Sequence, residues 1–327
     1  MGHDLKLVVL DGDPAAGSGL APREARGELN FALLEQLGSL VVYENTPEEL
    51  VVERAQGAAV VLTNKVPLTA ETIARLPELQ LISVLATGTN VIDVPAAHAR
   101  GVTVCNVPGY STASTAQLTI ALLLELCHHV GEHSRDVHAG SWSQARIFAY
   151  WTHPLLELEG LTLGIVGFGA IGQRVASIAR ALGMHILVHT RTPRSATDVQ
   201  FVDKATLLAQ SDVITLHCPL TPETHHFIDR KALGQIRRQA LLLNVARGPV
   251  VDSSAVADAL ESGRLGGYAA DVLEVEPPPA DHPLLGAPRC VLTPHIAWAT
   301  EASRKRLIQA THDNVAAFLA GAPQNVV

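Results

Sequence analysis

The feature that most constrains this chain is a glycine-rich turn between an apolar strand and a helix. Residues 161–172 read LTLGIVGFGAIG. A helix is expected over 173–182 and a second apolar strand at 186–188, so the segment predicts one βαβ unit. Because the first N–H groups of such a helix attract anions, we expect this turn to hold a pyrophosphate.

Each glycine of the turn has a separate role. Gly167 allows the tight bend, Gly169 lets the backbone approach the phosphates, and Gly172 lets the helix pack closely on the strand. The N–H groups at the helix start, those of Ala170 and Ile171, are expected to face the anion. The alternative is that the glycines serve packing alone.

The end of the second strand bears on which dinucleotide binds. An acidic residue there normally accepts hydrogen bonds from the adenosine ribose of NAD. This chain instead has Thr190, followed by Arg191 and Thr192. Since a guanidinium pairs well with a 2′-phosphate and a carboxylate would repel it, the sequence favours NADP, with NAD as the alternative coenzyme. It leaves open that Arg191 is only a solvated charge.

Composition excludes several classes of function. The 327 residues are 47% hydrophobic, enough for a sizeable core and two domains. A net charge of -8 and the lack of a basic run argue against a nucleic-acid surface. The start MGHD leads into a strand without a signal-peptide pattern, and the most apolar helix, 118–130, contains Glu125 and is too short to span a bilayer. We expect a soluble cytoplasmic protein without a membrane partner.

The cysteines and histidines do not indicate a metal site. The four cysteines are widely spaced, without a C-x-x-C pair. His129 and His133 have helical spacing, but the glutamate of an H-E-x-x-H motif is missing. We expect neither a disulfide framework nor a bound metal.

Strand and helix patterns alternate through the chain and predict an α/β fold of two doubly wound parallel-sheet units. In the first unit a helix is expected at 29–37 and a loop at 12–19, with strands at 7–10, 40–43, 58–63 and 81–85. A long helix is expected over 112–131. The second unit has predicted strands at 163–166, 186–188, 213–217, 240–245, 268–270 and 290–292. A last helix, 301–320, is expected to return to the first unit.

Three polar residues follow the ends of strands in the second unit, where α/β sheets place ligands. They are Arg247 in NVARG, Glu276 in DVLEVEP and His295 in TPHIAW. Each alone could be a structural or solvated group. Their joint occurrence beside a dinucleotide turn favours a catalytic site.

These motifs resemble the D-isomer-specific 2-hydroxyacid dehydrogenase family over nearly the whole chain. The similarity rests on the Gly167 turn, the segment HCPLTPET at 217–224 and the three polar motifs, which occur in the family's order. It implies a Rossmann coenzyme domain inserted in a flavodoxin-like substrate domain, and a homodimer. The expected substrate domain is 1–104 plus 297–327, and the coenzyme domain is 105–296, with 112–152 contributing to the dimer interface.

The chemistry that the resemblance implies fits these side chains. Arg247 would clamp a 2-keto acid carboxylate and polarise the carbonyl, and His295 would donate a proton with Glu276 holding its ring. Asp271 would contact the nicotinamide carboxamide, and Thr87 and Gly88 would offer N–H groups to the carboxylate. The remaining coenzyme contacts implied by the resemblance are Thr115, His217, Cys218, Pro219, Thr224 and Val245.

Two tryptophans bear on the substrate. Trp298 would narrow the pocket, and Trp142 is placed like an aromatic that some relatives extend into the neighbouring subunit; core packing is the alternative for both. The chain most resembles the glycerate dehydrogenase and hydroxypyruvate or glyoxylate reductase branch, so the expected substrate is a small 2-keto or 2-hydroxy acid. A phosphoglycerate dehydrogenase and a cofactor-sensing scaffold without turnover are the alternatives.

Overall fold

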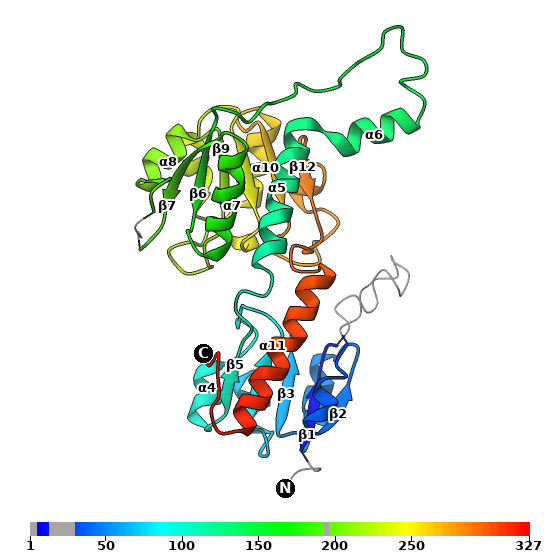
Figure 1. The fold of residues 1–327 in the computed structure, drawn as a ribbon, viewed down its shortest axis with the longest axis vertical. Helices are drawn as coiled ribbons and strands as arrows, with labels where there is room; N and C mark the ends of the chain where they lie inside the picture. Colours follow the sequence, from blue (N-terminus) through cyan, green and yellow to red (C-terminus); the bar gives the residue numbers. More distant parts are fainter. Residues whose placement is uncertain (1–4, 13–29, 193–195) are drawn as a thin grey trace. The chain divides into compact units, whose positions relative to one another are not determined.

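The computed structural model describes residues 5–12, 30–192 and 196–327 and divides the chain into two units (Figure 1). Unit 1 is Met1–Ser111 with Ala299–Val327, and unit 2 is Thr112–Trp298. The chain therefore leaves unit 1, completes unit 2 and returns. Of the loop expected at 12–19, all but Gly12 lies outside the described residues.

The sheet of unit 1 is fully parallel, with the order β2-β1-β3-β4-β5. This is the flavodoxin-like order, in which β2 and β3 pair with opposite edges of β1. Its strands are β1 (Lys6–Val9), β2 (Ser39–Val42), β3 (Val60–Thr63), β4 (Leu81–Val84) and β5 (Thr103–Cys105). Of the described strands in this sheet, β5 was not among the predicted ones.

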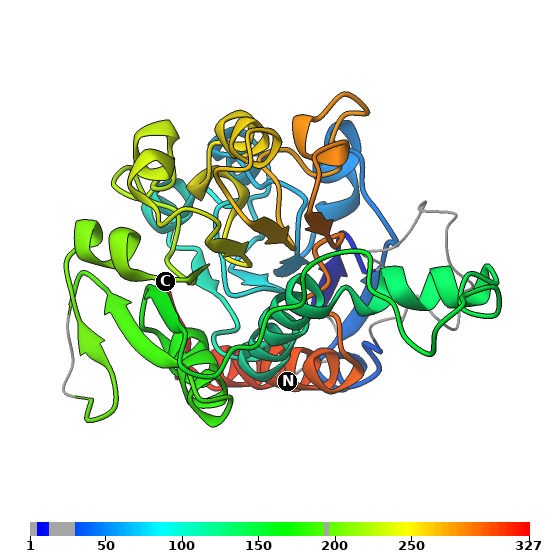
Figure 2. The same cartoon turned by 90° about the horizontal axis from the view of Figure 1, so that it is seen from above.

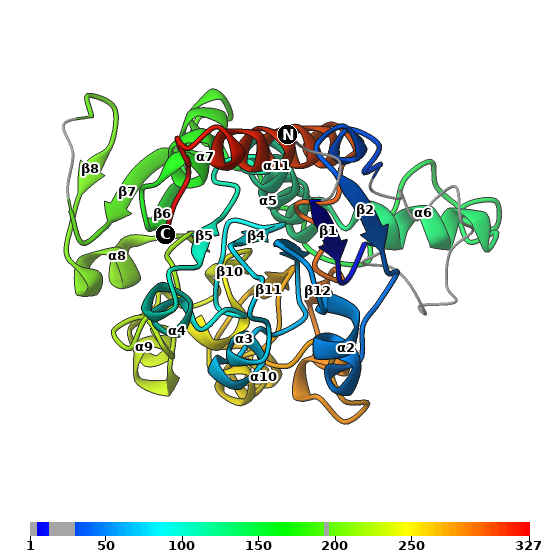
Figure 3. The same ribbon diagram turned by 90° about the horizontal axis from the view of Figure 1, so that it is seen from below.

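Helices cover both faces of this sheet (Figure 3). One face carries α11 (Glu301–Leu319), which packs on β4. The other carries α2 (Val51–Ala55), α3 (Ala70–Ala74) and α4 (Val94–Ala99). The helix predicted at 29–37 is wrong in its described part, which forms only the 3₁₀ turn η1 (Leu34–Gln36). A second 3₁₀ turn, η2 (Glu48–Leu50), precedes α2.

The sheet of unit 2 is also parallel, with the order β12-β11-β10-β9-β6-β7-β8. This is the Rossmann order with one further strand, and its topological switch point lies between β6 and β9. The strands are β6 (Thr162–Val166), β7 (His185–His189), β8 (Gln200–Phe201), β9 (Val213–Leu216), β10 (Leu241–Asn244), β11 (Gly267–Ala270) and β12 (Cys290–Leu292). The predicted fold class, two doubly wound parallel sheets, is confirmed.

The two faces of this sheet are buried by different helices because successive side chains point to opposite sides. Leu241 and Leu243 of β10 pack under α5 (Thr112–His128) and α7 (Ala170–Ala181). Leu242 packs on the opposite side. That side carries α8 (Lys204–Gln210), α9 (Arg230–Gln235) and α10 (Ser253–Glu261), with the 3₁₀ turns η3 (Gly248–Val250) and η4 (Pro283–Leu285).

The long helix predicted over 112–131 is confirmed over 112–128 as α5, but its last part is wrong because the chain breaks at His129. That residue has a left-handed backbone, with φ 50°, and α6 (Val130–His138) starts in a new direction. The carboxylate of Glu125 accepts a hydrogen bond from the Gly131 N–H at 3.1 Å, which satisfies one free donor of the new helix. From there α6 and the loop after it project away from the sheet of their own unit (Figure 2).

In the part of the chain that the structure describes, no helix combines the length and apolar character needed to cross a lipid bilayer.

Candidate active site

Arg247 stands on the turn after β10. The turn is shaped by Asn244, the last residue of the strand, which is fully buried. Its side-chain oxygen accepts from the Ala246 N–H at 3.1 Å, and its amide donates to the Arg247 carbonyl at 3.0 Å. The guanidinium itself donates to the Ala246 carbonyl at 2.7 Å. Arg247 is thus held in a fixed position at the carboxyl edge of the sheet.

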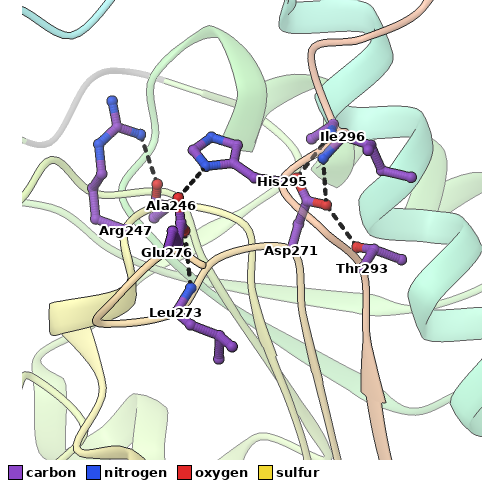
Figure 4. Close-up of polar contacts among 9 residues, drawn as sticks. Ala246, Arg247, Asp271, Leu273, Glu276, Thr293, His295 and Ile296 are labelled. Atoms are coloured by element: carbon purple, nitrogen blue, oxygen red, sulfur yellow. Dashed lines mark hydrogen bonds and ion pairs between the residues drawn. The ribbon is translucent and has the colours of Figure 1, made fainter. Parts of the chain in front are cut away.

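Glu276 stands on the loop after β11, the neighbouring strand. Its Oε1 accepts from the Leu273 N–H at 3.0 Å, which orients the carboxylate (Figure 4). Its Oε2 lies 2.6 Å from Nδ1 of His295. This contact has the length of a strong charge-assisted hydrogen bond.

His295 follows β12, the next strand along the edge. Its backbone is left-handed, with φ 53°, a conformation that costs a non-glycine residue energy. Because Nδ1 is engaged with Glu276, Nε2 is the nitrogen left to exchange a proton with a substrate. Figure 4 draws the imidazole directed at the Glu276 carboxylate and the guanidinium of Arg247 directed at the Ala246 carbonyl.

The turn that carries His295 is held by Asp271, which is 1% exposed. Its carboxylate accepts from the Thr293 hydroxyl at 2.6 Å and from the N–H groups of Ile296 and Ala297, both at 2.8 Å. Burial raises the pKa of Asp271, while these hydrogen bonds and the nearby His295 act in the opposite direction. The described contacts of Asp271 are with protein groups, and its contact with a nicotinamide carboxamide stays a prediction.

The glycine turn fits a pyrophosphate. Gly167 has φ +93°, and a Cβ on it would lie 2.7 Å from the backbone of His217 and Cys218. A Cβ on Gly172 would lie 2.3 Å from the Gly167 carbonyl oxygen. A Cβ on Gly169 would meet nothing within 4 Å, and no side chain caps the start of α7 there. The turn is therefore tight toward the protein and open at the helix start, as a phosphate cradle requires.

The expected adenosine contacts lie at the ends of β7 and β9. The strand β7 ends at His189, so Thr190 and the exposed Arg191 and Thr192 follow it directly. After β9, burial lowers the pKa of His217 to about 3 and raises that of Cys218 to about 11. The Nδ1 atom of His217 is buried and has no hydrogen-bond partner among the described residues.

The other predicted coenzyme residues occupy varied settings. The Thr224 hydroxyl donates to the Pro219 carbonyl at 2.6 Å and accepts from the Thr221 N–H at 2.7 Å, so it closes the turn beyond β9. Thr115 and Val245 are buried, in α5 and after β10 respectively. Direct contact of these residues with a coenzyme stays a prediction.

The predicted substrate residues are divided between the units. Thr87 and Gly88 follow β4 in unit 1, where the Thr87 hydroxyl donates to the Val107 carbonyl at 2.9 Å. Trp298 is partly buried at the end of unit 2. Trp142 is 52% exposed on the loop after α6, and its indole N–H donates to the Phe148 carbonyl at 2.9 Å, so core packing does not account for it.

Comparison with known proteins identifies the family of this chain. The profile described as "D-isomer specific 2-hydroxyacid dehydrogenase, NAD binding domain" matches residues 120–297. A hydroxypyruvate reductase of Blautia hydrogenotrophica is 43% identical over 329 residues, 99% of each chain. This chain belongs to the D-isomer-specific 2-hydroxyacid dehydrogenase family. The resemblance recognised in the sequence is confirmed.

Two further comparisons agree with this dehydrogenase assignment. A glycerate dehydrogenase of Methylorubrum extorquens is 43% identical over 289 residues, 87% of this chain and 90% of the relative. A solved acyclic imino acid reductase in complex with NADPH has a TM-score of 0.86 at 26% identity, covering 99% of this chain and all of that one. The coenzyme unit of the dehydrogenase thus has the fold of an NAD(P)-binding domain.

The residues that position the predicted catalytic groups were not among those predicted from the sequence. Asn244, Thr293 and Gly248 have this role; a Cβ on Gly248 would lie 2.0 Å from the Leu273 backbone. A partial signal existed, since an asparagine directly after an apolar strand favours side-chain to backbone turns. The close approach at Gly248 has no such local signal.

Proposed function

We propose that this chain reduces a small 2-keto acid, hydroxypyruvate or glyoxylate, to D-glycerate or glycolate with NAD(P)H. The observation that carries the proposal is the 2.6 Å contact between Glu276 and His295, on the strand ends next to that of Arg247. Relatives named hydroxypyruvate reductase, glycerate dehydrogenase and glyoxylate reductase support the substrate class.

The three side chains divide the work of a carbonyl reduction. A bound reduced nicotinamide supplies the hydride for the carbonyl carbon. The Arg247 guanidinium pairs with the carboxylate of the keto acid and draws electron density from the adjacent carbonyl. His295 gives a proton from Nε2 to the carbonyl oxygen, completing the hydroxyl, while Glu276 stabilises the charged imidazolium before transfer. In the reverse direction the neutral imidazole accepts that proton.

The test is a panel of keto acids with the wild-type protein and the variants His295→Ala and His98→Ala. We expect turnover of hydroxypyruvate and glyoxylate above that of a bulky aromatic keto acid, and a loss of about a hundredfold or more in turnover in His295→Ala. His98 is an exposed histidine of α4 in unit 1, so His98→Ala is the control for loss of an imidazole outside the site. Unchanged turnover in a folded His295→Ala protein would falsify the assignment, and no turnover of any keto acid would favour a cofactor-sensing scaffold.

For the coenzyme we propose a preference for NADP over NAD. Support comes from the lack of an acid at Thr190 and from the exposed Arg191 beside it. An opposing group is Glu223, whose pKa is lowered by hydrogen bonding from Thr221 and, in smaller part, by the charge of Arg191. A 2′-phosphate would therefore compete with the Glu223 carboxylate for the guanidinium.

This competition can be measured in one set of variants. Arg191→Gln is expected to raise the KM of NADPH about tenfold, because a charge-assisted pair is lost, and to leave the KM of NADH within about twofold. Glu223→Gln is expected to lower the KM of NADPH. A wild-type protein that uses NADH with the lower KM overturns the preference.

We also propose a homodimer formed through the segment after α5. Several large apolar side chains of this segment are exposed, among them Ile147 at 68%, Phe148 at 90% and Trp151 at 67%. They adjoin a hollow of about 430 Å³ that is lined by Val130, Val137, Tyr150 and Leu155. So much apolar surface on one projection is typical of a subunit interface.

The molar mass in solution tests the dimer. Wild-type protein is expected to have twice the chain mass of 34.7 kDa, and Phe148→Glu to shift it toward the monomer. A monomeric wild-type protein at assay concentration would remove this proposal. The cytoplasmic location stays a prediction from the sequence.

A further inference from the structure

A histidine–carboxylate pair outside the predicted catalytic groups joins His226 to Glu274. Nε2 of His226 is 3.4 Å from Oε1 of Glu274, and the same oxygen accepts from the Ser253 N–H at 3.3 Å, at the start of α10. Neither side chain belongs to the three predicted catalytic groups. Both are partly exposed, with 40% of the His226 side chain and 31% of the Glu274 side chain accessible.

His226 is attached to the turn that carries Arg247. Its backbone N–H donates to the Pro249 carbonyl at 2.8 Å, within η3, and Ile228 pairs with Val251 in a parallel bridge. The backbone of His226 is left-handed, with φ 48°, so its ring is set by a special local conformation. Movement of His226 would therefore displace Pro249, which is two residues from Arg247.

Glu274 is attached to the loop that carries Glu276. The Leu273 N–H, next to Glu274, donates to Oε1 of Glu276 at 3.0 Å (Figure 4). The backbone of Leu273 and Glu274 also packs against Gly248, where an added Cβ would come within 2.3 Å of both residues. The loop of the catalytic carboxylate and the turn of the catalytic guanidinium thus touch here.

We infer that His226 and Glu274 are positioning residues that fix the spacing between Arg247 and the Glu276–His295 pair. This rests on the proposed function. The pair joins the two backbone segments that carry opposite halves of the reacting site, so it controls whether the carboxylate and the carbonyl of one keto acid are engaged together. Misplacement of this kind reduces catalysis without any change in the groups that react.

The experiment compares His226→Asn, Glu274→Ala and the double variant with the wild-type protein. Asparagine tolerates the left-handed backbone, so His226→Asn removes the imidazole without adding strain. We expect each single variant to lower kcat/KM for hydroxypyruvate by about threefold to tenfold, and the double variant to lower it no further, since both act through one contact. The KM of NADPH and the thermal midpoint are expected to stay near the wild-type values. A merely structural role would instead lower the midpoint.

Asp313→Asn is the matched control, because it neutralises another histidine–carboxylate contact, with His312 at 3.1 Å, on α11. It is expected to leave every parameter unchanged. Oxalate binding to the NADPH complex, measured by calorimetry, tests the position of the bound carboxylate without turnover. In the two single variants its affinity is expected to fall by the same factor as kcat/KM. A wild-type protein that reduces no keto acid refutes the proposed function. Unchanged kcat/KM and oxalate affinity in both single variants, or effects that multiply in the double variant, refute the positioning role.

Discussion

Replacing Gly169 by alanine separates coenzyme binding from stability. Gly169 has φ -75° and ψ -167° and precedes α7, and an added Cβ there meets nothing within 4 Å. An alanine is therefore accommodated without strain. Lower entropy of the unfolded chain favours it by about 0.4–1 kcal/mol, and the poorer N-cap of α7 costs about 0.5–1 kcal/mol, so the two effects nearly cancel. We expect the free energy of unfolding to change by less than about 1 kcal/mol and the thermal midpoint by about 2 °C.

The same methyl group occupies the open side of the turn, where the pyrophosphate is expected to lie. Holding the phosphates away from the N–H groups of Ala170 and Ile171 should weaken NADPH binding about tenfold or more, equal to about 1.4 kcal/mol. Gly172→Ala gives the opposite pattern, because its Cβ would lie 2.3 Å from a backbone oxygen. Forcing the helix from the strand should cost about 1–3 kcal/mol of stability.

The assay is titration of NADPH followed by its fluorescence, paired with thermal unfolding of each protein without coenzyme. Gly234→Ala is the control, since a Cβ on that residue of α9 also meets nothing within 4 Å and lies outside the turn. If Gly169→Ala binds NADPH as tightly as Gly234→Ala at an unchanged midpoint, the turn is not the phosphate cradle.

Three other perturbations have defined outcomes. Glu276→Gln removes the charge that holds Nδ1 of His295 at 2.6 Å, so kcat/KM for the keto acid should fall by about tenfold to a hundredfold; a folded variant that keeps the wild-type kcat/KM contradicts this. Burial lowers the pKa of His217 to about 3, against about 6.5 in the unfolded chain. Between these two values the unfolded state binds more protons than the folded state, so the free energy of unfolding falls as the pH falls below about 6.5, by up to about 2 kcal/mol near pH 5. Urea unfolding at several pH values should show that His217→Gln loses this dependence. An equal slope of unfolding free energy against pH in both proteins refutes it. Arg247→Lys should reduce kcat/KM about tenfold or more, because an ammonium cannot reproduce the planar fork; retention of half the activity shows that charge alone suffices.

The regular parts of the fold were predictable because their signal is local. Buried parallel strands such as β3 and β9 are continuous apolar runs, and the turn at Gly167 has a specific sequence pattern. The break at His129 was not predictable. Residues 118–130 keep helical periodicity, and the break depends on one left-handed residue and on the Glu125 carboxylate.

The predicted catalytic residues could be named from the sequence, whereas the residues that hold them in place could not. Arg247, Glu276 and His295 are polar residues after apolar strands, and this position is itself a signal. Asp271 also follows a strand, but its hold on residues 293–297 joins segments far apart in the chain. Such contacts appear only when adjacent strands bring two loops together.

The place of α11 in the chain has a consequence for biosynthesis. This helix packs on β4 through a surface that buries Leu307, Ile308 and Val315, yet it is translated after all of unit 2. While the ribosome is still producing Thr112–Trp298, that side of the earlier sheet lacks its covering helix. Unit 2 can thus fold first, and the sheet of unit 1 is covered on that side only after Glu301–Leu319 has been synthesised.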